Sequence, residues 1–194
     1  MARYTGPVNK KMRFLGLEVP KKGVRNNRPQ VRRRISAYGL QLREKQKARF
    51  LYGILEKQFR NYYDKASKNP GSTGDLLLEY LEKRLDNALY RTGMFNTRRQ
   101  SRQAVNHAHF LVNDGKVNIP SFQVKVGDKI TWREKSKKSS LFEIATSNIQ
   151  NNDCAKWIAL DKSELSVQIN NSPSASDTEL NIDTRQIVEY YSRR

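Results

Sequence analysis

Most residues and segments that mark membrane, secreted and metal-binding proteins are missing from this chain. Among its 194 residues there is one cysteine, Cys154, so neither an internal disulfide nor a zinc site built from several cysteines can form. No run of about 18 apolar residues is present, and no apolar signal segment follows Met1. We therefore expect an intracellular protein in a reducing compartment that does not bind a membrane.

Residues able to hold a metal or a cofactor are also scarce. The chain has 2 histidines, His107 and His109, which are close together in the sequence. No cysteine lies near them to complete a metal site, so a polar contact to a partner or a structural role is the better interpretation. Glycine-rich phosphate loops and the H-E-x-x-H and G-x-S-x-G motifs are absent. We expect neither a metal nor a cofactor.

The acidic residues show no arrangement suited to catalysis. Glu79, Glu82 and Asp86 lie at helical spacing, but Lys83 and Arg84 stand among them. A solvated surface of paired charges is therefore a better interpretation than a general acid and base. We expect no catalytic residue.

Positive charge is what the chain has in excess, with a formal net charge of +18. The charge is unevenly distributed, because residues 1–74 carry +15, residues 75–138 carry +6 and residues 139–194 carry −3. A charge this large attracts polyanions. Its concentration toward the N-terminus favours a basic arm and helix directed at nucleic acid over a uniformly solvated surface.

The N-terminal part combines an irregular segment with a helical pattern. Residues 1–38 are rich in Lys, Arg, Gly, Pro and Asn and show little periodicity, so we expect an irregular arm that becomes ordered on its partner. From Leu40 to Tyr63, apolar residues at helical spacing predict a helix. The members of its apolar stripe are Leu51, Ile54, Leu55, Phe59 and Tyr62.

A second helix is predicted after the break at Asn69-Pro70-Gly71. Ser72 and Asp75 have the spacing of a capping box, and Gly93 marks the end of the helix. We expect this helix to bury its leucines, which are Leu78, Leu81, Leu85 and Leu89. Arg84 and Arg91 would then lie on roughly one face of it.

A short third helix is predicted to begin near Thr97, which has Gln100 three residues later. Arg98 and Arg102 are four apart and share a face, with Arg99 beside them. Guanidinium groups can hold phosphate oxygens with two hydrogen bonds, and the first N–H groups of a helix also favour an anion. This arginine cluster is therefore the predicted phosphate-binding surface.

The remaining sequence alternates strand, turn and helix patterns. Phe110 to Val112, a turn at Asp114-Gly115, and Val117 with Ile119 predict a β-hairpin. The other expected elements are a strand at Ile130-Thr131-Trp132, a helix containing Leu141, Ile144, Ala145 and Ile149, a strand at Val167 and Ile169, a polar loop over 171–179, and an apolar C-terminal segment at 187–191 that docks onto the body. Together these patterns predict a chain that contains both helices and strands.

Short motifs follow one another between Leu81 and Ile130 in a specific order. They are Leu81-Glu82-Lys83-Arg84-Leu85-Asp86-Asn87, the arginines Arg98, Arg99 and Arg102, His107-Ala108-His109, Val112-Asn113-Asp114-Gly115-Lys116-Val117, Ile119-Pro120-Ser121 and Gly127-Asp128. This series resembles the S4 RNA-binding domain, which also occurs in pseudouridine synthases, tyrosyl-tRNA synthetases and heat-shock RNA binders. The resemblance implies that this part of the chain binds RNA.

Other motifs extend the resemblance outside that segment. They are Met1-Ala2-Arg3-Tyr4-Thr5-Gly6-Pro7, Tyr38 to Lys47, Tyr52-Gly53, Gln58 to Tyr63, Trp157-Ile158, Leu160-Asp161 and Ile187 to Ser192. With them, nearly the whole chain resembles the bacterial-type family of small-subunit ribosomal protein S4, least so at residues 8–37 and 133–155.

The family pattern implies an α+β fold and the way in which that fold is divided. Residues 1–38 would be a basic extended arm, and 39–80 a helical domain completed by 181–194. Residues 81–145 would form the S4 RNA-binding domain, with arginine-rich helices packed on a small, mostly antiparallel sheet. The segment 146–180 would supply the rest of the sheet and its connecting loops.

The resemblance also implies a function. The protein would be a structural, non-enzymatic constituent of the small ribosomal subunit that binds its RNA directly and nucleates assembly at a multi-helix junction. Further implied partners are the neighbouring proteins S5 and S3 and the messenger RNA where it enters the subunit, with an influence on translational accuracy. The expected location is the cytoplasmic ribosome, and an organellar ribosome stays an open alternative.

The RNA-binding residues expected on this basis come from both parts of the chain. They are Arg32, Arg33, Arg34, Arg43, Lys45, Lys47 and Arg49 in the N-terminal part, and Arg84, Arg91, Arg98, Arg99, Arg102, His107, His109, Asn113 and Lys116 in the S4 domain. Many bacterial members carry four N-terminal cysteines that bind zinc, but residues 1–38 contain none, so we expect no zinc. Ala108 stands where a glycine is common.

Two alternatives belong to other classes of protein. An RNA-modifying enzyme or a stress RNA binder could carry an S4 domain, but an enzyme would need a catalytic domain for which only residues 139–194 remain. A helix-turn-helix DNA-binding protein would prefer duplex DNA to a folded RNA junction.

Overall fold

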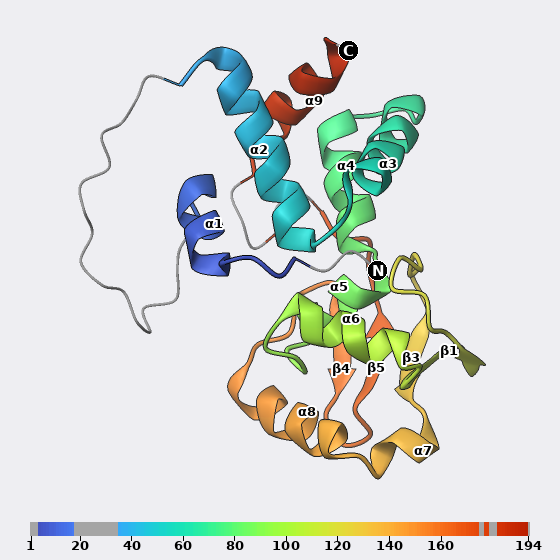
Figure 1. Ribbon diagram of the computed structural model, residues 1–194. Coiled ribbons are helices and arrows are strands. Elements are labelled where there is room, and N and C mark those ends of the chain that lie inside the picture. The colour runs from blue at the N-terminus through green and yellow to red at the C-terminus, as the bar shows by residue number, and fades with distance from the viewer. Residues whose placement is uncertain (1–3, 18–34, 175–176, 179–181, 194) are drawn as a thin grey trace. The chain divides into compact units, whose positions relative to one another are not determined.

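The computed structural model describes residues 4–17, 35–174, 177–178 and 182–193 of the chain (Figure 1). The chain divides into two compact units, of which the first comprises Met1–Asn61 with Asn181–Arg194 and the second Tyr62–Leu180. Because segments from both ends of the chain belong to the first unit, the second unit is an insertion within it.

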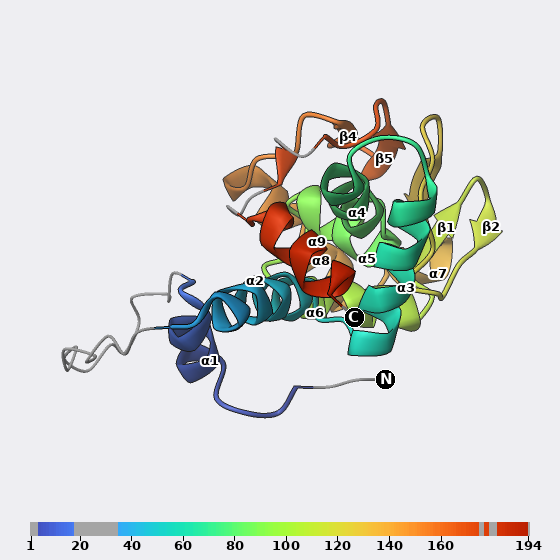
Figure 2. The same ribbon diagram turned by 90° about the horizontal axis from the view of Figure 1, so that it is seen from above.

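The first unit is helical. Its elements are α1 (Val8–Leu15), α2 (Ala37–Tyr52), the start of α3 (Glu56–Lys68) and α9 (Thr184–Ser192). Helix α9 packs against α2 and buries Ile187 and Tyr190 (Figures 1 and 2). The apolar C-terminal segment therefore docks as the sequence predicted.

The helix predicted from Leu40 to Tyr63 is interrupted at Gly53. That residue has a left-handed backbone, with φ of 60°, and its N–H donates to the carbonyl of Phe50, 3.2 Å away. Glycine adopts this conformation at little steric cost, which ends α2 and redirects the chain. The predicted apolar stripe therefore does not stay on one face: Phe59 is buried, but the side chain of Leu55 is 58% exposed.

The prediction of an irregular arm is wrong where the structure describes that arm beyond Pro7. Residues Val8–Leu15 form α1, which Gly16 ends in a left-handed conformation with φ of 73°. Leu15 and Leu17 are buried, so burial of a few apolar side chains holds a helix that charge composition did not reveal. Residues 18–34, with Arg32, Arg33 and Arg34, lie outside the described part of the chain.

The second unit combines helices with a sheet, and the strand pairs described are all antiparallel. Its helices are α4 (Thr73–Glu82), α5 (Leu85–Arg91), α6 (Arg98–Asn106), α7 (Glu134–Lys137) and α8 (Ser140–Asn151). Its strands are β1 (Phe110–Val112), β2 (Gly115–Lys116), β3 (Lys129–Trp132), β4 (Ile158–Asp161) and β5 (Ser166–Ile169). They form one sheet with the order β2-β1-β3-β5-β4, which confirms the α+β prediction.

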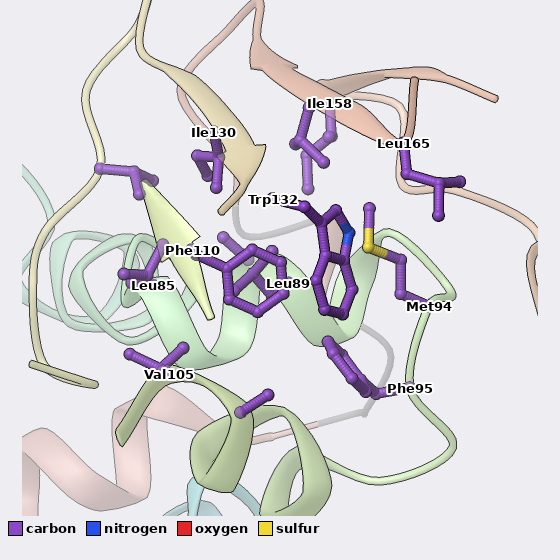
Figure 3. Packing of buried hydrophobic residues seen from close by; sticks show 14 of the residues in the cluster. Leu85, Leu89, Met94, Phe95, Val105, Phe110, Ile130, Trp132, Ile158 and Leu165 are labelled. Atoms are coloured by element: carbon purple, nitrogen blue, oxygen red, sulfur yellow. The ribbon is translucent and has the colours of Figure 1, made fainter. Parts of the chain in front are cut away.

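Aromatic side chains form the centre of the core that α5, α6, α8 and the sheet share (Figure 3). The ring centroid of Trp132 lies 4.5 Å from that of Phe110, 5.2 Å from that of Phe142 and 6.3 Å from that of Phe95. Offset and edge-to-face contacts at these distances favour packing beyond the burial of area alone. This core fixes the first strands of the sheet against the arginine-bearing helix α6.

The predicted second helix is also interrupted, at Arg84. Helix α4 ends at Glu82 and α5 begins at Leu85, with Arg84 in an extended conformation between them. Arg84 forms an isolated antiparallel bridge with Gln123, and the Leu85 N–H donates to the Phe122 carbonyl, 2.8 Å away. All four predicted leucines are buried, but Arg84 and Arg91 do not lie on one face of a continuous helix.

The hairpin turn lies one residue earlier than predicted. Val112 pairs with Gly115, so the turn residues are Asn113 and Asp114, with φ of 47° and 63°. Asn and Asp tolerate positive φ better than most residues, so this pair suits a two-residue hairpin turn. Strand β2 ends at Lys116, and the prediction did not include the short α7 or β4.

Candidate nucleic-acid interface

Helix α6 carries arginines on one side and small apolar residues on the other. Thr97 caps it, because its Oγ1 accepts a hydrogen bond from the N–H of Gln100, 3.2 Å away. Ser101, Ala104 and Val105 are buried against the body of the unit. Arg99 is exposed, and Arg98 and Arg102 are half-buried, so the predicted arginine cluster does line one side of this helix.

Two residues of α5 hold the outer arginines of α6. Arg102 donates from its Nε to Oδ2 of Asp86 at 2.6 Å, and Arg98 donates from its Nε to Oδ1 of Asn87 at 2.8 Å. The Arg98 guanidinium also lies over the ring of Tyr90, 4.3 Å from its centroid. Helices α5 and α6 therefore form a single electrostatic network.

Arg84 lies inside the fold and is not presented to a ligand. Its side chain is 2% exposed and donates to both carboxylate oxygens of Asp86, at 3.0 and 2.9 Å, and to the Tyr62 hydroxyl at 3.0 Å. Burial lowers the pKa of Arg84, but Asp86 and Tyr62 outweigh it and the net pKa is raised. The sequence-based role of Arg84 in RNA binding is therefore corrected to a structural one.

The surroundings of Arg91 and of two nearby acidic residues differ from those expected from the sequence, because these side chains are engaged or buried within the fold. The Nε of Arg91 lies 3.4 Å from Oε2 of Glu82, and the guanidinium donates to the backbone carbonyl of Asp177. Glu82 and Asp86 are buried, so they do not belong to a solvated face of paired charges. Only Glu79 fits that interpretation, through a 2.5 Å pair with Lys83.

Asn113 ties the hairpin turn to the loop before β3. Its Nδ2 donates to Oδ1 of Asp128 at 2.9 Å, and its Oδ1 accepts from the N–H of Lys129 at 2.9 Å. Asp128 accepts a further hydrogen bond from the N–H of Lys125, 2.8 Å away. The side chain of Asn113 is thus used inside the fold, and it brings two exposed lysines to the hairpin that also carries the exposed Lys116.

The two histidines lie at the C-terminal end of α6. His107 is exposed, and its ring centroid is 6.0 Å from that of His109, whose Nδ1 lies 2.9 Å from Oγ of Ser136. Burial, and then the electrostatic interaction with His107, lower the pKa of His109. Ala108 between them has a left-handed backbone with φ of 56°.

Because a left-handed backbone costs a non-glycine residue about 1–2 kcal/mol, Ala108→Gly should stabilise the protein. The extra freedom of glycine in the unfolded chain offsets part of this gain, so we expect an increase of about 0.5–1 kcal/mol in the free energy of unfolding. Denaturant titration would measure it. Ala104→Gly, inside α6, is the matched control and should destabilise by about 1 kcal/mol. Equal losses in both variants would contradict the prediction.

The N-terminal basic residues fall into two groups. Lys45 is buried, with its Nζ 2.7 Å from Oε1 of Glu56 and 4.4 Å from the centroid of the Tyr190 ring. Its predicted role in RNA binding is therefore corrected to a structural one. Arg43, Lys47 and Arg49 are half-buried on the same helix, Lys47 pairing with Glu44 and Arg49 with Glu56.

Glu56 links α9 to α2 and gives the first unit a pH dependence. Tyr191 donates to Oε1 of Glu56 at 2.8 Å, beside Lys45. Burial raises the pKa of Glu56, but the hydrogen bonds from Lys45 and Tyr191 outweigh it and leave the pKa below its ordinary value. A depressed pKa gives a stabilisation that is present above the ordinary glutamate value of about 4.3 and is lost as pH falls through the folded-state value.

We therefore expect Glu56→Gln to destabilise the protein near pH 7 and to have a smaller effect as pH falls from about 5 to about 3. Unfolding by urea, followed by circular dichroism at several pH values, would measure the difference between the two proteins. Glu143→Gln, an exposed change on α8, is the matched control. A difference that is independent of pH would show that the Glu56 charge contributes nothing to docking of α9.

Two features are absent from the part of the chain that the structure describes. No helix in this part is long and apolar enough to cross a membrane. The same residues contain no group of three or more His, Cys, Asp or Glu placed to hold a metal ion.

Comparisons with known proteins assign the α+β unit that carries the arginine-bearing helix and the lysine-bearing hairpin to the S4-domain proteins. The family model for the ribosomal protein S4/S9 N-terminal domain matches residues 3–82, and the model for the S4 domain matches residues 83–130. The chain belongs to the uS4 family of small ribosomal subunit proteins, as its relatives show.

Relatives named small ribosomal subunit protein uS4 align along the whole chain. The protein of Chloroflexus aurantiacus is 46% identical over 206 residues, that of Cutibacterium acnes 45% over 205 residues and that of Desulforamulus reducens 43% over 208 residues. In each case the alignment covers 100% of this chain and 100% of the relative. The similarity therefore includes both compact units.

Proposed function

We propose that this protein is a structural constituent of the small ribosomal subunit and binds ribosomal RNA directly. The observation that carries the proposal is the alignment, over all of both chains, with relatives named small ribosomal subunit protein uS4. The net charge of +18 and the arginine-bearing side of α6 supply the physical means of holding a phosphate backbone.

The proposed RNA surface of the second unit combines α6 with the β1–β2 hairpin. Arg98, Arg99 and Arg102 can each direct N–H donors at phosphate oxygens, which favours them over lysine for a fixed geometry. Lys116, Lys125 and Lys129 are exposed on the hairpin and on the loop that Asn113 fastens to it. His107 is exposed at the end of α6 and completes this surface.

The proposed RNA contacts of the N-terminal part are Arg43, Lys47 and Arg49 on α2, together with Arg32, Arg33 and Arg34. Residues 81–145 would then supply most of the RNA contacts, and residues 39–80 with 181–194 the helical body. We propose further that binding occurs early in assembly at a multi-helix junction, and that the protein contacts S5, S3 and the incoming messenger RNA in cytoplasmic ribosomes.

The test is a filter-binding titration with a small-subunit ribosomal RNA fragment that contains a multi-helix junction, with duplex DNA as competitor. Wild-type protein should prefer the junction RNA, and its affinity should fall steeply with salt. The double variant Arg98→Ala/Arg102→Ala should lose about 0.7–0.9 of the log–log salt slope for each phosphate contact removed. Lys156→Ala/Lys162→Ala removes the same charge outside the proposed surface and is the control.

Equal affinity for junction RNA and duplex DNA would contradict the proposal, since charge alone would then explain binding. An equal change of slope in the two double variants would remove Arg98 and Arg102 from the interface while leaving the ribosomal assignment intact.

A further inference from the structure

We propose that Asp86 and Asn87 are positioning residues, which fix the guanidinium groups of Arg102 and Arg98 in the orientation that binds the RNA backbone. The proposal rests on the function proposed above. It concerns two residues of α5 that carry no positive charge and that composition alone would not connect with RNA. Neither side chain needs to touch the RNA, because each acts through an arginine of α6.

Asp86 is a fixed acceptor for Arg102. Its carboxylate is 3% exposed, and Oδ2 accepts from Nε of Arg102 at 2.6 Å and from Nη2 of Arg84 at 2.9 Å. Arg84 also donates to Oδ1 at 3.0 Å. The two hydrogen bonds from Arg84 therefore fix the orientation of the Asp86 carboxylate. The backbone carbonyl of Asp86 accepts from the Ser101 hydroxyl at 2.6 Å, which holds α6 at the residue before Arg102.

Asn87 plays the same part for Arg98. Its Nδ2 donates to the backbone carbonyl of Glu82 at 3.0 Å and to Oε2 of Glu82 at 2.9 Å. Because both bonds use the amide nitrogen, the amide oxygen faces the other way and accepts from Nε of Arg98 at 2.8 Å. Tyr90 supports the guanidinium from its ring face, with 4.3 Å to the ring centroid.

The two contacts have a common feature, which is that each arginine of α6 donates to its α5 partner from Nε. A guanidinium has five N–H donors, of which Nε supplies one, and phosphate is commonly bound through the terminal nitrogens, so the bond at Nε does not itself block such a contact. A mobile arginine side chain loses rotamer freedom when it binds, and that loss weakens association. Fixing Arg98 and Arg102 before RNA arrives lowers this cost, which is the physical role that we assign to Asp86 and Asn87.

Charge and positioning make opposite predictions for Asp86→Asn. The substitution removes a negative charge next to two arginines, so long-range electrostatics alone would strengthen RNA binding. Positioning predicts weaker binding, because an amide holds Arg84 and Arg102 less firmly than a carboxylate does. The sign of the change therefore separates the two effects.

The matched control is Asp153→Asn, which makes the same change of charge in the same unit. Asp153 is exposed in the loop after α8, outside the proposed RNA surface. We expect Asp153→Asn to bind the junction RNA as tightly as wild type or slightly more tightly. We expect Asp86→Asn to bind about three- to tenfold more weakly, with a similar salt slope because no cation is removed.

A double-mutant cycle tests whether Asp86 acts through Arg102. In an Arg102→Ala background, Asp86→Asn should produce little further loss of affinity. Thermal unfolding of each variant would show that binding is measured on folded protein. A second readout is the ¹⁵N–¹H signal of the arginine Nε groups in RNA-free protein, where Asp86→Asn should broaden or shift the Arg102 signal.

If Asp86→Asn does not fold, Arg98→Lys tests the Asn87 half of the proposal. Lysine keeps the charge of the half-buried Arg98 but has no Nε for the Asn87 oxygen. We expect it to lose about three- to tenfold in affinity and to lose more than Arg99→Lys, the matched change at the exposed arginine between them.

Asp86→Asn binding as tightly as Asp153→Asn would overturn the positioning role of Asp86. Equal losses in Arg98→Lys and Arg99→Lys would overturn that of Asn87. Failure of the wild-type protein to prefer junction RNA would instead overturn the proposed function itself, so the two failures are distinguishable.

Discussion

Arg84→Ala should lower the free energy of unfolding by about 3–5 kcal/mol, because it breaks a buried ion pair and leaves the buried Asp86 carboxylate with Arg102 as its remaining cationic partner. Arg84 is 2% exposed and supplies two of the hydrogen bonds that Asp86 accepts. Its loss would also remove the hydrogen bond that Arg84 donates to the Tyr62 hydroxyl. Urea unfolding monitored by circular dichroism would measure the change.

The matched control for Arg84→Ala is Arg99→Ala, which removes an exposed arginine from α6. We expect Arg99→Ala to change stability by less than about 0.5 kcal/mol but to weaken RNA binding and reduce its salt slope. Arg84→Ala should show the reverse pattern, with a salt slope like that of wild type once the folded fraction is taken into account. A smaller salt slope in Arg84→Ala would return this residue to the RNA surface.

Arg84 also shows which features of the fold could be predicted from the sequence. The apolar spacing of Leu81, Leu85 and Leu89 correctly identified buried residues, but it continues across the break between α4 and α5. Periodicity cannot reveal that break, because it depends on the pairing of Arg84 with Gln123, which lies far along the chain. The start of α6 at Thr97 was predicted correctly, because a capping residue depends only on its neighbours in the sequence.

The candidate site shows the same difference between features that are local in the sequence and features that depend on distant residues. Composition identified the arginines of α6 and the lysine of the hairpin, because an excess of charge is visible in any sequence. It did not separate exposed cations from buried ones, since Lys45 is buried by Tyr190 and Glu56, one of them at the far end of the chain. Asp86 and Asn87 were missed for a related reason: the function that we propose for them is to hold other residues, and their motif was the only signal of it in the sequence.

The second large effect is expected at the aromatic core. Trp132 is 2% exposed and contacts Phe110, Phe142 and Phe95, with ring centroids 4.5, 5.2 and 6.3 Å away. Replacing such a residue with alanine removes its buried area and leaves a cavity that the surroundings fill only in part. We therefore expect Trp132→Ala to lower the free energy of unfolding by about 3–5 kcal/mol.

This substitution also provides its own spectroscopic probe. The chain has 2 tryptophans, and Trp157, which is 2% exposed, belongs to the same core. In Trp132→Ala, fluorescence from Trp157 alone reports unfolding of the second unit. Val126→Ala, at a residue that is 55% exposed, is the control and should stay within about 0.5 kcal/mol of wild type.

Trp132 should affect RNA binding only through the fold. It pairs with Phe110 across β1 and β3, and Phe110 and Phe95 flank the segment that contains α6. Loss of the tryptophan should therefore increase hydrogen exchange in α6 and in the hairpin while all the proposed RNA-binding cations stay in place. At a temperature where Trp132→Ala is fully folded, the salt slope of RNA binding should match that of wild type, and the affinity should fall by less than in Arg98→Ala/Arg102→Ala. A reduced slope in the folded variant would mean that the core determines which cations reach the RNA, and not merely how stably they are held.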